Sequence, residues 1–513
     1  MKIKYLIAIG FLVASANVKS QNNQPTFYDE PHRPQIHFSP KEKWMNDPNG
    51  MVYYKDVYHL FYQYYPGGTV WGPMHWGHAT SKDLVHWQEL PIALYPDSLG
   101  YIFSGSAVVD VNNTAGFGKD GKVPLIAIFT HHDPKGEKAG KNDFQYQSIA
   151  YSLDEGKTWT TYAGNPVVKN PGIRDFRDPK VTWHEQTKKW IMTLATKDRV
   201  TFYSSPNLKD WTKESEFGEK VGAHGGVWEC PDLISLDYKG EKVWVLFVSI
   251  NPGGPNGGSA TQYFTGKFDG KTFTPSQTDT RWVDYGPDNY AGVTWANTGK
   301  RKIFLGWMSN WQYATRVPTE RWRSAMTVPR DLTIEKVGER YLLTSKPSPE
   351  IKALESKVKT INNILVENFD LTSRTGKVTG PVRLDFTSDK LESFSITLSN
   401  SKGQKVVLGY DKQTNNYFID RTASGKVNFE KGFAAKHIAP RLLNNGAVDV
   451  SLIIDNASVE LFADKGLSVM TQIFFPDENF SDITIQSGDN FKIKSLRFAE
   501  LKSIYKSDIV ASH

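Results

Sequence analysis

The segment Ser81-Lys82-Asp83-Leu84-Val85-His86-Trp87 is a polar turn that ends in tryptophan. The chain repeats this pattern at 152–159 and 205–211, and a weaker copy follows at 268–273. Short β-rich runs bounded by Gly, Pro, Asn and Asp lie between the copies. Repeats that each hold several strands are typical of propeller blades, whereas coincident hairpin turns are the alternative reading. The pattern predicts an all-β propeller over residues 21–345.

The sequence changes in character after about residue 344. Residues 346–360 contain the Lys346-Pro347-Ser348-Pro349 segment and predict a linker. Alternating apolar and polar residues follow, for example at 382–386 and 448–454, and few of them are tryptophan. This alternation predicts a β-sandwich over residues 361–513, which we expect to support the first domain.

Residues 1–20 have the features of a secretory signal peptide. Lys2 and Lys4 precede an apolar stretch, and small residues near position 20 form a cleavage site. That stretch is too short to span a bilayer, and the chain lacks a cysteine behind it for a lipid anchor. The single cysteine, Cys230, excludes an intramolecular disulfide. We therefore expect an exported protein, either periplasmic or extracellular.

The net charge of the 513-residue chain excludes a polyanion-binding protein. The formal charge is +6, but three lysines of the predicted leader account for half of it. No basic run alternates with aromatic residues as nucleic-acid binding requires. Aromatic residues make up 13% of the chain and include 15 Trp, which is typical both of carbohydrate sites and of all-β cores.

Three short motifs place a carboxylate beside a proline and an aromatic ring. They are Trp44-Met45-Asn46-Asp47-Pro48-Asn49-Gly50, Phe176-Arg177-Asp178-Pro179 and Trp228-Glu229-Cys230-Pro231-Asp232. Glycoside hydrolysis with retention needs one carboxylate as nucleophile and one carboxyl group as proton donor. A third carboxylate that binds ring hydroxyls adds affinity for the transition state. The three motifs together therefore indicate a glycosidase.

Each motif taken alone also has a structural reading. Asp47 and Asp178 precede prolines, which favour extended backbone, and the first motif is also a common turn sequence. Arg177 and Asp178 could form a structural ion pair, and Glu229 could be an ordinary strand residue. For Glu229, Trp228 and Asp232 are expected to form surroundings that favour a proton donor.

Other clusters do not predict a metal or cofactor. His75, His78 and the 131–133 segment lack the ligand number and scaffold of a zinc site. The glycine-rich segment 251–258 lacks the ending of a phosphate-binding loop and predicts a surface loop. We expect neither a metal ion nor a cofactor.

As an ordered set, the motifs resemble glycoside hydrolase family 32, the β-fructosidases that include invertases, levanases and exo-inulinases. The set includes Phe103-Ser104-Gly105-Ser106, and the resemblance covers residues 32–330. Val459-Glu460-Leu461-Phe462, which follows Asp455, resembles the sandwich domain of this family. The resemblance implies a propeller of five blades with the site in its central funnel.

The resemblance also implies roles for single residues. Asp47 would be the nucleophile, Glu229 the acid and base, and Asp178 the residue that stabilises the transition state. The residues expected to contact the terminal sugar are Asn46, Gln63, Trp71, Phe103, Ser104 and Arg177, with Trp307 and Trp311 as candidates for the rim.

We therefore expect an exo-acting β-fructosidase for levan, inulin, fructo-oligosaccharides and sucrose. Residues 100–106 resemble the loop that closes around a terminal fructose. The open alternatives are a sucrose-preferring invertase, an endo-acting levanase, a fructosyltransferase and an arabinan-cleaving relative. From a different class, a non-catalytic fructan-binding protein would keep the same pocket. The preferred linkage stays open.

Overall fold

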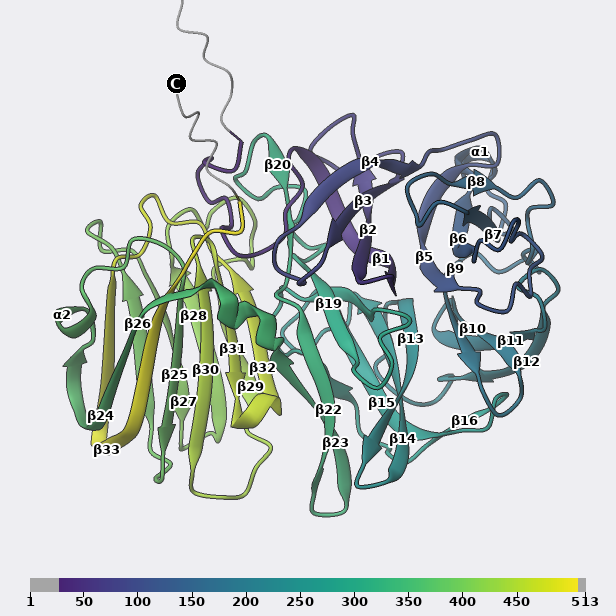
Figure 1. Cartoon of the computed structure of the whole chain (residues 1–513). Helices are drawn as coiled ribbons and strands as arrows, with labels where there is room; N and C mark the ends of the chain where they lie inside the picture. The colour runs from purple at the N-terminus through teal and green to yellow at the C-terminus, as the bar shows by residue number, and fades with distance from the viewer. Residues whose placement is uncertain (1–26, 506–513) are drawn as a thin grey trace, which may run out of the picture.

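A computed structural model describes residues 27–505, with the side chain of Asp489 excepted. The predicted signal peptide at 1–20 lies outside the described residues. Figure 1 shows two β-rich bodies side by side, one formed by the purple to teal part of the chain and the other by the green to yellow part. Among the described residues, no helix has the length and apolar character needed to cross a bilayer.

The first body is a propeller of five sheets, which confirms the predicted fold. The first three blades follow each other along the chain. The first contains β1 (Lys43–Tyr54), β2 (Val57–Tyr65), β3 (His75–Ser81) and β4 (Gln88–Leu94), and the second contains β5 (Tyr101–Val109), β6 (Leu125–His132), β7 (Gln145–Ser152) and β8 (Thr160–Thr161). The third contains β9 (Phe176–His184), β10 (Lys189–Thr196), β11 (Arg199–Ser205) and β12 (Thr212–Phe217). Helix α1 (Pro134–Lys138) lies between β6 and β7.

The last two blades add short accessory strands. The fourth contains β13 (Val227–Tyr238), β14 (Glu241–Asn251), β15 (Ala260–Phe268) and β16 (Phe273–Pro275), with β17 (Arg281–Trp282) paired to β15. The fifth contains β18 (Tyr290–Thr294), β19 (Ile303–Met308), β22 (Arg330–Val337) and β23 (Arg340–Pro347), with β21 (Ala325–Met326) paired to β19.

The first strands of the five blades form the inner ring. β1 contacts β5, β5 contacts β9, β9 contacts β13, β13 contacts β18, and β18 contacts β1. Strand β20 (Trp322–Arg323), which lies between β19 and β21 in the chain, pairs in parallel with β1, and Val52 forms a parallel bridge with Ala296. Segments between the strands of the fifth blade are thereby joined to the first blade.

The repeated polar turns connect the third and fourth strands of their blades. In the first copy, Asp83 accepts hydrogen bonds from the backbone of Val85 and His86, and the Trp87 indole donates to the Leu84 carbonyl. In the third copy, Asn207 and Trp211 make the equivalent bonds. The local sequence repeat is thus a repeat of structure, and coincident hairpins are excluded.

The second body is a β-sandwich, as predicted. Its elements are η1 (Pro349–Leu354), β24 (Glu355–Asp370), α2 (Thr372–Thr375), β25 (Val382–Ser388), β26 (Phe394–Ser399), β27 (Lys405–Asp411), β28 (Asn416–Ala423), β29 (Lys436–Pro440), β30 (Val448–Asp455), β31 (Ser458–Ala463), η2 (Asp464–Gly466), β32 (Ser468–Ile473) and β33 (Asp482–Leu501). β33 pairs with β26 through its first part and with β25 through its last part, so it joins the two layers. The predicted linker range, 346–360, contains the end of β23, η1 and the start of β24.

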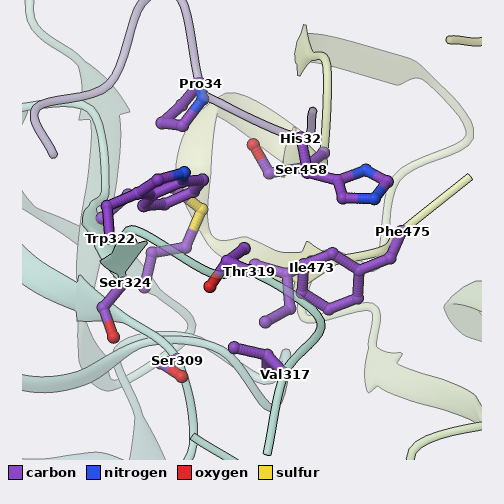
Figure 2. A pocket seen from close by; sticks show the side chains of 13 residues that line it. His32, Pro34, Ser309, Val317, Thr319, Trp322, Ser324, Ser458, Ile473 and Phe475 are labelled. Atoms are coloured by element: carbon purple, nitrogen blue, oxygen red, sulfur yellow. The ribbon is translucent and has the colours of Figure 1, made fainter. Parts of the chain in front are cut away.

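Buried charges and a small cavity mark the contact between the two bodies. The buried His37 imidazole bonds to Asp455 at 2.7 Å and to Glu460 at 2.8 Å, both from the sandwich. Residues of both bodies also line a cavity of about 40 Å³, and Figure 2 shows their side chains. Four of the lining residues, His32, Thr319, Ser324 and Ser458, each have a buried polar side-chain atom with no hydrogen-bond partner in the part of the chain that the structure describes. The cavity has room for ordered water, and none of the predicted site residues lines it.

Candidate active site

Each inner strand departs from regular pairing close to its start. The unpaired residues are 46–47 in β1, 103–104 in β5, 178–179 in β9, 230–231 in β13 and 291–292 in β18. A β-bulge turns side chains away from the regular alternation and often lies next to a functional site. Three of these positions, Asp178, Cys230 and Ala291, also have left-handed backbone, with φ of 65°, 46° and 53°. Backbone strain of this kind clusters at functional sites.

Asp47 is held by hydrogen-bond donors on both oxygens. The Asn46 amide donates to Oδ1 at 3.0 Å, and the Ser104 hydroxyl donates to Oδ2 at 2.8 Å. Burial raises the pKa of Asp47, and the nearby charge of Glu229 raises it further, whereas the two donors oppose this shift. The donors therefore orient the carboxylate and favour its ionised form.

Asp178 is buried at the start of β9. Its backbone N–H donates to the Thr130 hydroxyl at 3.0 Å, and its Oδ2 accepts from the Cys230 backbone N–H at the same distance. Burial raises the pKa of Asp178; the Arg177 guanidinium lowers it, and the carboxylates of Glu229 and Asp47 raise it. The three carboxylates therefore interact electrostatically.

Glu229 lies between a cation and a phenol. Its Oε1 accepts from Arg177 Nη2 at 2.9 Å, and its Oε2 accepts from the Tyr290 hydroxyl. The prediction that Trp228 and Asp232 surround the Glu229 carboxyl group is wrong. The Trp228 indole donates to the Ala223 carbonyl instead. Asp232 likewise turns away and accepts from Thr294. Neighbouring strand residues point to opposite faces, which explains the error for Trp228.

Tyr290 and Asp175 also belong to this cluster, although no sequence motif predicted them. Tyr290 begins β18 and belongs to no recognised motif, although its place at the start of the fifth inner strand was an available signal. Asp175, which lies three residues before Asp178, accepts from Arg177 Nη1 at 2.6 Å. All five blades therefore contribute a polar side chain to the axis.

Cys230 joins the three carboxylates. It follows Glu229 in the chain, and its sulfur lies 3.5 Å from Asp47 Oδ2 and 3.6 Å from Asp178 Oδ2. Burial, reinforced by these carboxylates, holds the pKa of the thiol well above its usual range. The thiol is thus a neutral, weak donor to the acids. Among the described residues, no group of His, Cys, Asp and Glu has the arrangement of a metal site.

The predicted sugar contacts lie at different depths. Gln63 is buried, and its Nε2 has no partner among the described residues. Trp71 is 40% exposed and meets the half-buried Phe103 ring edge-on at 6.0 Å. Trp311 is half-buried and stacks on Trp44 at 5.8 Å.

The predicted place of Trp307 at the rim is wrong. Trp307 is 0% exposed and lies with Trp44 and Trp311 in an aromatic cluster. All six residues of β19 are buried, so the strand has no alternation that would have revealed which side chains face a ligand. Trp307 is therefore buried within this cluster, and its indole Nε1 has no hydrogen-bond partner among the described residues.

Comparisons with known proteins agree on one family. Family models for the N-terminal domain and the C-terminal part of glycosyl hydrolases family 32 match residues 37–347 and 350–500. A levanase from Bacillus subtilis (strain 168) is 45% identical over 494 residues, which span 94% of this chain and 72% of the relative. An extracellular exo-inulinase from Aspergillus awamori is 42% identical over 490 residues, 88% of this chain and 91% of the relative.

Solved structures give the same result. The crystal structure of the exo-inulinase from Aspergillus awamori has a TM-score of 0.85 and 38% identity, and the match covers 93% of this chain and 100% of that one. A β-fructofuranosidase from Schwanniomyces occidentalis, complexed with fructosyl-erythritol, has a TM-score of 0.84 and 34% identity over 94% and 100% of the two chains. With its five-bladed propeller, its sandwich and both family domains matched, the chain belongs to glycosyl hydrolase family 32.

Proposed function

We propose that this protein is an exported, retaining β-fructosidase that hydrolyses terminal β-D-fructofuranosyl residues of fructans. The observation that carries the proposal is the convergence of Asp47, Asp178 and Glu229, from three blades, around Cys230. A cluster of three carboxylates with one arginine has an excess of negative charge. Such an environment stabilises the positive charge that develops on the fructosyl ring in the transition state.

In the proposed mechanism, Asp47 attacks C2 of the terminal fructose, and Glu229 protonates the departing glycosidic oxygen. Glu229 then removes a proton from water, which hydrolyses the fructosyl ester and releases β-fructose. Asp178 binds ring hydroxyls and stabilises the transition state without forming a covalent bond. The fixed donors around Asp47 and Glu229 support these roles, because a double displacement requires both groups in place, about 5–5.5 Å apart.

The names of the relatives and the residues at the rim bear on the substrate. Levan, inulin, fructo-oligosaccharides and sucrose are the proposed substrates, with exo action as the proposed mode. The partly exposed Trp71 lies beside Phe103, where its ring would contact a second sugar. A sucrose-preferring invertase or an endo-acting levanase would use the same acids with a different rim.

Export of the mature chain is part of the proposal. The basic, apolar and small-residue segments of the leader support it, and so do the relatives described as extracellular. Either a periplasmic or an extracellular destination satisfies the proposal.

Release of fructose from levan, inulin and sucrose, measured side by side by chromatography, tests the function. We expect release by the wild type and none by Asp47→Ala. Asp237→Asn is the matched control, because it removes a charge from an exposed position of β13. Unchanged release by Asp47→Ala would end the assignment of the nucleophile, and binding without release by the wild type would favour a fructan-binding protein.

A further inference from the structure

A guanidinium from the sandwich is buried where the sandwich meets the propeller. Arg421, in β28, is 0% exposed. Its Nη1 donates to Asp288 Oδ2 at 2.8 Å, and its Nη2 donates to the Tyr313 hydroxyl at 3.0 Å. The Tyr313 hydroxyl donates to the other oxygen of Asp288. These three side chains therefore form a closed, buried triangle across the two bodies.

Asp288, one of the three residues of the triangle, is connected to the predicted acid, Glu229. Asp288 lies two residues before Tyr290, whose hydroxyl donates to Glu229. The Asp288 carboxylate also accepts from the backbone N–H of Ile473, in the sandwich, at 2.9 Å. The start of β18 is therefore tied to the sandwich on one side and to Glu229 on the other.

Tyr313, the second residue of the triangle, is connected to the predicted nucleophile, Asp47. Tyr313 follows Trp311 by two residues in the same turn, and the Trp311 ring stacks on Trp44. The Trp44 indole donates to Asn46 Oδ1 at 2.8 Å, and the Asn46 amide donates to Asp47. The link from Tyr313 to Trp311 runs along the backbone of this turn, and the later links are direct contacts between buried or half-buried side chains.

We propose that Arg421 is a positioning residue that holds both catalytic carboxylates in their working geometry. This inference rests on the proposed function. The planar guanidinium bonds Asp288 and Tyr313 at once, and its Nε is fixed by the Phe433 carbonyl at 2.6 Å. Lysine cannot form this pair of hydrogen bonds to Asp288 and Tyr313, because its ammonium is a point charge on a flexible chain. The sandwich thus helps to build the site as well as to stabilise the propeller.

Two variants and a matched control test this role. Arg421→Lys keeps the charge but loses the paired hydrogen bonds to Asp288 and Tyr313, and Tyr313→Phe removes only the hydroxyl. Arg441→Lys is the control, because Arg441 is also a buried sandwich arginine, and the hydrogen bonds of its side chain all end within the sandwich. Turnover of sucrose and levan is measured on the folded fraction of each protein, together with hydrogen exchange.

We expect kcat to fall at least tenfold in Arg421→Lys and severalfold in Tyr313→Phe, with KM nearly unchanged, because small displacements of reacting groups are costly. Hydrogen exchange should rise over 288–290 and 310–313. Arg441→Lys should lose stability but keep the wild-type kcat. A purely structural role would give Arg421→Lys the same result as this control.

Wild-type kcat and wild-type exchange in both Tyr313→Phe and folded Arg421→Lys would overturn the inference. If Arg421→Lys does not fold, Tyr313→Phe alone decides. A wild type that releases no fructose would refute the proposed function instead. Hydrogen exchange over 288–290 and 310–313 would then still decide whether Arg421 orders the two segments.

Discussion

Two clusters of buried carboxylates differ in how their charges are balanced. At the propeller axis, Asp178 and Glu229 pair with one cation, Arg177, which also pairs with Asp175, and no ion pair among the described residues includes Asp47. Where the propeller meets the sandwich, the charges are nearly balanced, with four buried acids and three cations: Asp455 and Glu460 contact His37, Asp284 and Glu460 contact Arg330, and Asp288 contacts Arg421.

The pKa values of Asp178 and Glu460 illustrate this difference, whereas burial raises the pKa of Asp288 although Arg421 opposes the shift. Burial raises the pKa of Asp178, and its carboxylate neighbours add to that shift. Burial would also raise the pKa of Glu460, but Arg330 and His37 outweigh it and lower the pKa. Unbalanced charge therefore marks the cluster proposed for chemistry, and balanced charge marks the cluster that holds the two bodies together.

The largest expected effect comes from neutralising an acid at the axis. Asp47→Asn should lower kcat by about 10⁴-fold, because the nucleophile is lost. The free energy of unfolding should stay the same or rise, since the change removes a buried like charge. Steady-state kinetics and thermal unfolding of the same sample measure both. A large loss of stability would mean that Asp47 is a structural residue.

Removing an acid from the balanced cluster should have the opposite effect. Glu460→Ala leaves Arg330 and His37 without their shared partner, which should cost about 3–5 kcal/mol of unfolding free energy. On the folded fraction, kcat should remain within a fewfold of the wild type. Denaturant titration checks the first expectation; unaltered stability would contradict it.

The same cluster should make stability depend on pH. Burial would lower the pKa of His37, but bonds to Asp455 and Glu460 raise it from 6.5 to about 9. Since the folded-state pKa is the higher one, the stabilisation is complete below pH 6.5 and is lost as the pH rises through about 9. Thermal midpoints across this range should fall, and His37→Gln should flatten the fall.

The smallest expected effect lies at the rim. Trp71→Ala should weaken binding of a fructan chain by about 1 kcal/mol, or roughly fivefold in KM, because one partly exposed ring is lost. The kcat should change little, since no acid moves. Initial rates on inulin and levan test this, and a lowered kcat with normal KM would place Trp71 closer to the chemistry.

The sequence predicted what depends on local pattern. Polar turns such as 81–87 and 205–211 occur in four of the five blades, so a propeller could be predicted from them. The motifs around Asp47, Asp178 and Glu229 could be recognised from their local sequence. The family resemblance then assigned the three acids to one site. The structure brings these three residues together at the axis.

The partners of these acids could not be predicted in the same way. Tyr290 and Arg421 lie in no motif, and their importance depends on contacts between distant segments. Trp307 belongs to a strand buried on both faces, where sequence alternation does not distinguish the ligand side from the core. The surroundings of Glu229 were misjudged because sequence neighbours on a strand face opposite ways.

Mass spectrometry of a trapped intermediate tests the central claim most directly, namely that the unbalanced axial cluster performs a double displacement through Asp47. Glu229→Ala, supplied with β-fructosyl fluoride, should form the ester without needing a proton donor and hydrolyse it slowly. The account predicts one added hexosyl group on the peptide that contains Asp47, and none in the variant that also carries Asp47→Asn. A hexosyl group on any other residue would contradict it.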